Sequence, residues 1–389
     1  MTSPTEQPPA PSDTLSIADV VFTEATPHQR ILSWTLNGAS WAGNMTLDQH
    51  IGRETALSEA ALSANGGTTY FILHPRDDPE TIVSACEVTR KRACVLSGED
   101  GGNQPREVTA YGIASVFTNP RFRGRGMASH MLRKVQEFVD NELKAEFGAL
   151  YSDIGREYYT RLGWRDWRTP QLLLTLSEAK RDGGGGSSAT LSANGSVPIY
   201  EEDVRKLAKE DIQRVKDSLI ASAKRGNGGD KTRIAFLPHT EQFLWHFTRD
   251  RYMCKVLAGR EVVNRGAKTP DSSAWVLWDH DLRERKLKVL RLVEDTAGTN
   301  SDDKRRADVK TLLRAAVAEA ADWGLPKVSV WSPSGVTATA AADLWCELQP
   351  RVQVALEERM DGSIPSLRWK EDKPVDDVIW EANEYYAWC

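Results

Sequence analysis

The chain has 389 residues, of which 40% are apolar and 27% charged, and its formal net charge is −5. This length and composition indicate a globular protein with enough apolar residues for two cores, and they exclude a disordered or fibrous chain. The small excess of acidic residues argues against a nucleic-acid-binding protein, which would present a large basic surface.

The five cysteines are scattered and form no Cys-x-x-Cys pair, which predicts reduced thiols, a cytoplasmic location and no metal site. The first thirty residues lack the basic flank and apolar core of a secretory signal, and no run approaches the ~20 apolar residues of a membrane span. Residues 1–14 are rich in Pro, Ser and Thr and are predicted to be a disordered tail.

The segment after this tail is predicted to combine helices with a meander of strands. Residues 19–26 form a strand that ends at Pro27, and Thr46 is a suitable N-cap for the second helix. Trp34 and Trp41 lie in this N-terminal segment. Such large aromatic residues usually belong to the core, and the alternative is that they line a substrate pocket. The expected helices are 29–36 and 47–63, and the expected strands are 68–74, 81–96 and 107–118.

The most informative stretch follows the last of these strands. The strand stops at Pro120, a short turn contains Gly124 and Gly126, and an amphipathic helix begins at Met127. Because glycine has no Cβ, such a backbone can approach a ligand closely and point several N–H groups in one direction. At the start of a helix, unpaired N–H groups and the helix dipole favour an anion. The turn is therefore a candidate anion site.

Three arginines in the same turn strengthen this interpretation. Arg121, Arg123 and Arg125 add cations whose planar shape matches phosphate. The commoner phosphate motifs do not fit, because the Walker A pattern is absent and Ser129 stands where the dinucleotide fingerprint has its third glycine. A solvated arginine turn or an RNA-binding Arg/Gly patch is the alternative. We expect a pyrophosphate site.

The segment Arg121-Phe-Arg-Gly-Arg-Gly-Met-Ala128 resembles the Arg/Gln-x-x-Gly-x-Gly/Ala signature of the GNAT acetyltransferases, whose loop binds the pyrophosphate of acetyl-CoA. Residues 149–164 resemble the second signature of that family, a strand followed by Phe-Tyr-x-x-x-Gly-Phe. The resemblance covers about residues 19–176 and implies an α/β GNAT fold, with a central mixed, largely antiparallel sheet flanked by helices. It also implies acetyl-CoA as cosubstrate. The residues that it assigns to acetyl-CoA are Val116, Phe117, Thr118, Arg121, Arg123, Gly124, Arg125, Gly126, Met127 and Ala128.

A Gly/Ser-rich run at 181–198 is predicted to link the acetyl-CoA-binding domain, residues 15–180, to a second domain, residues 199–389. The second domain repeats the GNAT-like order of elements, and strands at 352–358 and 366–369 could close a sheet. The segment before its alanine-rich helix is acidic, so we expect a degenerate GNAT-like domain that lacks the pyrophosphate loop. It is expected to supply walls that select the amine; a structural or dimerising domain is the alternative. Its other predicted elements are helices 201–223, 241–249, 307–323 and 336–346 and strands 274–278, 286–292 and 327–331.

Acetyl transfer to an amine requires a neutral amine and a proton donor for the departing thiolate. By the resemblance, Tyr159 matches the tyrosine that donates this proton in many GNAT enzymes, and the alternative is that Tyr158 or Tyr159 is merely core. Glu87, Asp153 and Glu24 lie on or beside predicted strands and are candidates for the base, of which we select Glu87.

The layout of the whole chain and its ending, residues 363–369 and 383–389, resemble the fungal lysine acetyltransferases of lysine catabolism. This resemblance implies transfer of the acetyl group to the side-chain amine of free L-lysine. The alternatives are a GNAT enzyme for another small amine or a protein lysine, and a non-catalytic acyl-CoA-binding regulator. The sequence predicts neither a nucleic-acid nor a membrane partner and does not define the oligomeric state.

Overall fold

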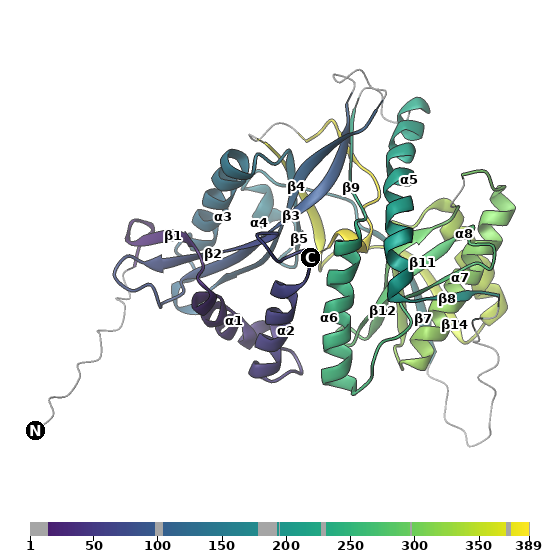
Figure 1. Cartoon of the computed structure of the whole chain (residues 1–389), viewed down its shortest axis with the longest axis horizontal. Coiled ribbons are helices and arrows are strands. Elements are labelled where there is room, and N and C mark those ends of the chain that lie inside the picture. The colour runs from purple at the N-terminus through teal and green to yellow at the C-terminus, as the bar shows by residue number, and fades with distance from the viewer. Residues whose placement is uncertain are drawn as a thin grey trace, which may run out of the picture.

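The computed structural model describes residues 15–97, 104–177, 193, 195–226, 231–295, 298–370 and 375–388. The predicted tail and most of the predicted linker lie outside these residues. Two mixed sheets, each accompanied by helices, make up the described part of the chain (Figure 1). None of its helices combines the length and apolar character that crossing a membrane requires.

The first sheet runs in the order β1-β2-β3-β4-β5-β15-β6, with β9 paired to β3 and β16 paired to β9. Its pairs are antiparallel except β4 with β5 and β16 with β9. The strands are β1 Val20–Glu24, β2 Thr68–Pro75, β3 Ser84–Leu96, β4 Arg106–Thr118, β5 Phe147–Ser152, β6 Arg165–Asp166, β9 Thr232–Phe236, β15 Ile364–Trp369 and β16 Val378–Trp380. The largely antiparallel, mixed sheet of the prediction is confirmed.

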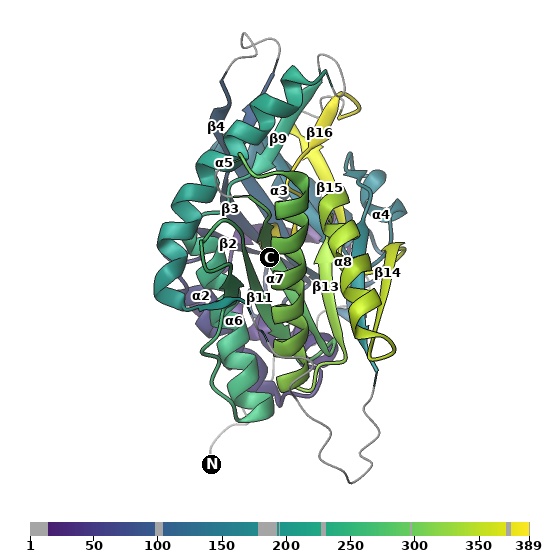
Figure 2. The ribbon, with the colours of Figure 1, turned by 90° about the vertical axis from the view of Figure 1, so that its right-hand side faces the viewer.

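The second sheet runs in the order β14-β7-β13-β12-β11-β10-β8. Helices α7 and α8 cover its outer face, as Figure 2 shows, and their apolar side chains pack on those of the central strands. The strands are β7 Pro170–Leu176, β8 Val197–Ile199, β10 Gly266–Lys268, β11 Trp275–Asp281, β12 Lys286–Val293, β13 Lys327–Trp331 and β14 Val352–Glu358.

Each half of the chain contributes strands to the other half's sheet. Strand β7, from the N-terminal half (residues 15–180), lies between β13 and β14 of the second sheet. In return, β15 from the C-terminal half (residues 199–389) pairs with β5, and β9 pairs with β3. The strands expected to close one sheet, at 352–358 and 366–369, therefore lie in different sheets. A periodic apolar pattern identifies a strand but not its partner, which explains the difference.

The helices follow the predicted periodicity, with changes at their ends. Thr26 and Thr46 cap α1 and α2, each accepting a backbone N–H three residues later. Helix α6 runs well past its predicted end and stops at Gly259, which adopts the left-handed conformation that closes helices. The bounds are α1 Pro27–Trp41, α2 Leu47–Glu59, α3 Met127–Phe138, α4 Glu157–Thr160, α5 Val204–Lys224, α6 Thr240–Ala258, α7 Asp302–Asp322 and α8 Gly335–Leu348.

Helices α1 and α3 lie on opposite faces of the first sheet. Tyr70 and Ile72 of β2 pack with Trp34 of α1, whereas the alternate residues Phe71 and Leu73 belong to the core that contains α3. This follows from the alternation of side chains along a strand. The two faces therefore offer separate approaches to the same strands.

Candidate active site

Strands β4 and β5 pair in parallel and then diverge. The last pair joins Ile113 to Leu150, although β4 continues to Thr118. A bulge accompanies the divergence, because Ser115 has a φ of 53° and the register between β3 and β4 shifts beside it. The predicted cofactor residues Val116, Phe117 and Thr118 lie beyond the last pair, so β5 takes none of their backbone groups.

The glycine turn that follows has the geometry expected of an anion site. Gly124 and Gly126 have φ angles of 76° and 75°, which L side chains rarely adopt, and a Cβ at Gly124 would meet no atom within 4 Å. Gly126 is the N-cap of α3 and offers no side chain to the first N–H groups of the helix. Met127 is buried and Ala128 is half-buried, so Met127 can offer only its backbone. The open turn and uncapped helix fit a pyrophosphate.

The arginines of the turn connect it to the end of β4. The Arg123 side chain donates from Nε to the Thr118 carbonyl oxygen, 3.1 Å away, and its guanidinium lies 5.5 Å from the centre of the Phe117 ring. Arg125 reaches the Leu15 carbonyl oxygen at 3.5 Å. Neither Arg123 nor Arg125 forms an ion pair with any described residue. Their charges are therefore available to phosphate.

Glu87 lies on β3 opposite Ala114, directly beside the bulge. Its carboxylate accepts hydrogen bonds from Ser115 and from Trp34 of α1, and together these residues line a small pocket. Burial and the neighbouring carboxylate of Glu54 raise the pKa of Glu87 to about 8, because both disfavour its charged form. The charged form, which can take a proton from a substrate, therefore predominates only above about pH 8.

Tyr159 lies on the opposite face of the sheet. It belongs to α4, it is 8% exposed, and it packs in the core that contains Cys86, the residue before Glu87. Burial raises the pKa of Tyr159, so that its phenol remains protonated at neutral pH. The neighbouring Tyr158 is engaged elsewhere, since its hydroxyl lies 3.1 Å from the Ser129 hydroxyl. The role of Tyr159 as the proton donor stays a prediction.

The other predicted bases lie in less suitable places. Asp153 accepts a hydrogen bond from the backbone N–H of Ser363 at 2.7 Å, and the Glu24 side chain is 63% exposed. Sequence reasoning considered Trp34 only in general terms and missed Ser115 altogether. A positive φ at a serine leaves no pattern in the sequence, so no signal for Ser115 was present.

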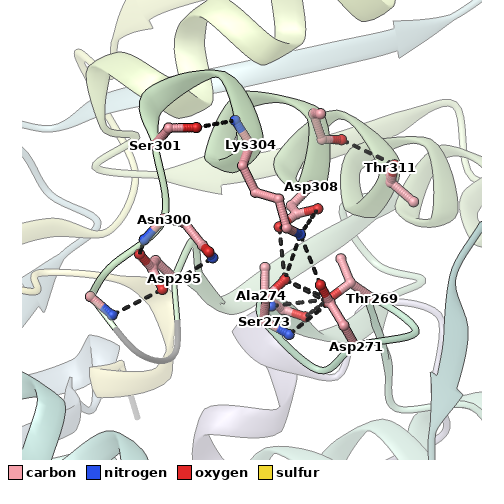
Figure 3. A network of polar contacts seen from close by, with 12 residues as sticks. Thr269, Asp271, Ser273, Ala274, Asp295, Asn300, Ser301, Lys304, Asp308 and Thr311 are labelled. Carbon is pink, nitrogen blue, oxygen red and sulfur yellow. Dashed lines mark hydrogen bonds and ion pairs between the residues drawn. The ribbon is translucent and has the colours of Figure 1, made fainter.

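The corresponding loop of the second sheet follows β12 and leads into α7. The Asp295 carboxylate accepts the backbone N–H of Gly298 at 2.9 Å and that of Asn300 at 2.7 Å (Figure 3). Ser301 caps α7 by accepting the N–H of Lys304. In this loop the protein's own oxygen atoms bind the N–H groups that an anion would need.

Lys304, in the first turn of α7, is also engaged. Its Nζ lies 2.7 Å from Asp308 and 2.9 Å from Asp271, as the close-up shows (Figure 3). A phosphate at this helix start would therefore meet a satisfied loop and three carboxylates. The expectation that the C-terminal half lacks a pyrophosphate loop stays a prediction, and this geometry supports it.

One group of buried side chains in the described part of the chain, Asp250, Cys254 and His280, has donor atoms within metal-ligand reach of one another. Arg265 donates to Asp250 at 2.8 Å, and Glu319 lies 2.9 Å from His280. Hydrogen bonds to these two carboxylates outweigh burial and raise the pKa of His280 to about 9. Because each of these side chains already has a polar partner within the protein, we interpret the group as an ion-pair network.

Comparisons with known proteins agree with this fold. The chain is 25% identical to an uncharacterized protein of Saccharomyces cerevisiae, across 95% of this chain and 98% of that one. It is 22% identical to a lysine acetyltransferase of Yarrowia lipolytica, across 64% of this chain and 70% of that one. A GCN5-related N-acetyltransferase structure from Kribbella flavida superposes with a TM-score of 0.53 at 15% identity, covering 91% of this chain and 72% of that one.

The family described as "LYC1 GNAT-like C-terminal domain" matches residues 186–389. This match spans more than half of the chain, and the GNAT fold extends over the remainder. The chain therefore belongs to the LYC1-like family of GNAT N-acetyltransferases.

Proposed function

We propose that the protein transfers the acetyl group of acetyl-CoA to the side-chain amine of free L-lysine, as a step of lysine degradation in the cytoplasm. The observation that carries the proposal is Glu87, a carboxylate with a raised pKa beside the β4 bulge where β4 and β5 diverge. The resemblance to the Yarrowia lipolytica lysine acetyltransferase supports the acceptor.

The residues around the divergence fit acetyl-CoA. The pyrophosphate would be held by N–H groups at the start of α3, by the backbone of the glycine turn and by its arginines. The pantetheine arm would lie along the free edge of β4 at residues 116–118. When bound, acetyl-CoA supplies the activated thioester. The backbone groups of that edge can orient the reacting carbonyl.

Glu87 is proposed to remove the proton of the substrate ammonium. An amine must be neutral to act as a nucleophile, whereas a free lysine side chain is charged at neutral pH. With a pKa of about 8, Glu87 is charged at alkaline pH and loses its charge when it accepts this proton. Ser115 and Trp34 fix the carboxylate by their hydrogen bonds.

Tyr159 is proposed to return a proton on the other side of the sheet. Its phenol remains protonated in the resting enzyme, and a departing thiolate is basic enough to accept the proton. The two proton-transfer groups come from opposite faces of the same strands, so proton removal and proton return are separated in space. In direct transfer the amine nitrogen attacks the thioester carbonyl and loses a proton, while the carbon–sulfur bond breaks and the departing thiolate gains one. The two groups would therefore act on different atoms.

Turnover of acetyl-CoA should be measured with free L-lysine, with a panel of other small amines and with a lysine-containing histone-tail peptide. We expect free L-lysine to give the highest kcat/KM. Preference for another amine or for the peptide would overturn the acceptor but retain the enzyme class. Tight acetyl-CoA binding without turnover of any amine would instead indicate a non-catalytic regulator.

A further inference from the structure

Arg359 stands where the chain passes from the second sheet to the first. It follows β14 directly and precedes β15 by a few residues. Its N–H donates to the Thr169 carbonyl oxygen at 3.1 Å, and its carbonyl oxygen accepts the Thr169 hydroxyl at 2.7 Å and the Arg156 side chain at 3.4 Å. The backbone that carries this arginine is therefore fixed on both sides.

The Arg359 side chain is held as well, although it forms no ion pair with a described residue. Its guanidinium lies 3.5 Å from the centre of the Trp331 ring, a stacked cation–π geometry. Among the described residues it forms no ion pair, and its Nε is buried without a hydrogen-bond partner. Burial lowers the pKa of Arg359 to about 10, because the loss of water outweighs the opposite effect of nearby groups, among them Glu284 and Glu358.

Other arginines of this interior are paired. Arg291 binds Asp211 at 2.8 Å, and Arg368 binds Asp140 at 2.7 Å. Because an unpaired buried cation is costly, arginines in protein interiors normally have such partners. Arg359 is half-buried and has no such partner among the described residues.

Arg249 also forms no ion pair with a described residue, but its surroundings differ. Its guanidinium lies 5.6 Å from the centre of the Trp388 ring. Asp281, Asp279 and Glu54 raise its pKa, so acids of the protein compensate its charge at a distance. Of the two arginines, Arg359 is the one for which burial outweighs the nearby acids.

Arg359 is linked to the divergence of β4 and β5 through two rings. Trp331, on which its guanidinium stacks, lies 6.1 Å from the Tyr151 ring. Tyr151 follows Leu150, the last residue of β5 that pairs with β4. The cation therefore belongs to the C-terminal half but stands beside the end of β5, where the two strands separate.

The two halves of the chain place groups of opposite charge near the divergence of β4 and β5. Glu87, from the N-terminal half, lines the pocket beside the bulge, where its carboxylate can accept the proton of an ammonium group. Arg359 offers a planar, preoriented donor to a carboxylate. A free amino acid has both groups on one small molecule, whereas a simple diamine has no carboxylate.

We propose that Arg359 binds the α-carboxylate of the amino-acid acceptor and so makes the enzyme selective for an amino acid over the corresponding diamine. This inference rests on the proposed function and assigns a specificity role to the C-terminal half. Binding of the carboxylate would also give the buried guanidinium the anion that the described residues do not provide.

The test compares L-lysine with cadaverine, which is lysine without its carboxylate. In Arg359→Gln, KM for L-lysine should rise about 10- to 100-fold, the range for a lost charge-assisted contact, with kcat little changed. KM for cadaverine should stay within about twofold, which also shows that the variant is folded. Arg359→Lys keeps the charge but not the planar group that stacks on Trp331. Its KM for L-lysine should lie between those of the wild type and Arg359→Gln.

Arg168→Gln is the matched control. Arg168 is an exposed arginine 3.5 Å from Glu358, the residue before Arg359, and its loss should change neither KM. Equal effects of Arg359→Gln on L-lysine and cadaverine, or no effect on either, would overturn the role of Arg359. A wild-type enzyme that prefers cadaverine to L-lysine would instead overturn the acceptor itself.

Discussion

The arginine loop (residues 119–126) and the acidic loop (residues 294–301) each lead from a strand of a mixed sheet into a helix. In the first, the N-cap of the helix is Gly126, which offers no side chain to the helix N–H groups. In the second, Asp295 accepts the loop N–H groups of Gly298 and Asn300, and Ser301 accepts a helix N–H group. A loop of this kind binds an external anion only when the protein supplies none of its own. The difference also explains why one cofactor site is expected in a chain with two similar sheets.

The largest effect should come from placing an acid in the arginine loop, and the same change in the acidic loop serves as its control. Gly124→Glu should weaken acetyl-CoA binding at least ~100-fold, because a carboxylate would face the pyrophosphate. Gly298→Glu is the matched control, since Gly298 has a similar φ of 67° and equally open surroundings. Calorimetry with acetyl-CoA checks both variants. Equal affinity for the two, or loss of binding in both, would break the comparison.

The comparison extends to proton transfer, because Tyr159 lies beside the diverging strands of the first sheet. Tyr159→Phe removes only the hydroxyl, and kcat should fall by about 10² or more with little change in acetyl-CoA affinity. In Tyr158→Phe the hydroxyl contact to Ser129 is lost, and kcat should change less than about threefold. Steady-state kinetics at saturating acetyl-CoA measures kcat for both variants. A wild-type kcat in Tyr159→Phe would mean that Tyr159 has only a structural role.

Glu87→Gln should lower kcat/KM by about 10² at pH 8. Because the pKa of Glu87 is about 8, wild-type activity should fall as this carboxylate is protonated, and the ratio of wild type to variant should shrink towards pH 6. Taking the ratio at each pH removes the titration of the substrate amine. A ratio that is constant between pH 6 and 9 would exclude Glu87 as the base.

Glu87→Gln, which should lower activity, should raise stability at neutral and alkaline pH. The pKa of Glu87 lies above its ordinary value of 4.5, so the unfolded chain loses this proton before the folded protein does. The contribution of Glu87 to stability is therefore lost as pH rises from about 4.5 to 8. Thermal unfolding of Glu87→Gln relative to wild type should show a Tm difference that grows in favour of the variant over this window.

The smallest effect is expected in the acidic loop. Asp295→Ala leaves two backbone N–H groups without their acceptor and should lower the free energy of unfolding by about 1 kcal/mol. It should not create a second cofactor site, because Ser301 still caps α7 and Lys304 remains paired with acids. Calorimetry should still show one acetyl-CoA per chain. A second binding event would mean that Asp295 alone separates the two loops.

Much of the local structure could be predicted because it depends on neighbours in the sequence. The cap at Thr46 and the two glycines of the arginine loop are signals of this kind. The pairing of β5 with β15 is not, because both strands have the same alternation as many others. Strand β9, which is nearly all buried, lacks a polar alternation and escaped prediction for that reason.

The candidate site shows the same division. The arginine loop could be named from sequence because its function requires glycines and cations at fixed spacing. Glu87 could be selected only as one of three acids, since its distinguishing property is the hydrogen bonding and burial that α1 and the bulge create. Arg359 could not be selected from the sequence. What distinguishes it is that it lacks an acidic partner among the described residues, and only the folded structure shows this.

The exchange of strands between the halves bears on how the chain folds as it is synthesised. Strand β5 ends at Ser152, whereas its neighbour β15 begins only at Ile364, so β5 emerges from the ribosome well before its partner. At a synthesis rate of about 5–20 residues per second, the edge of β5 waits for roughly ten seconds or more without that partner. Until then it is an unpaired strand edge beside apolar residues, which is a site of aggregation. Nascent chains of this protein should therefore depend on chaperones until β15 has been translated.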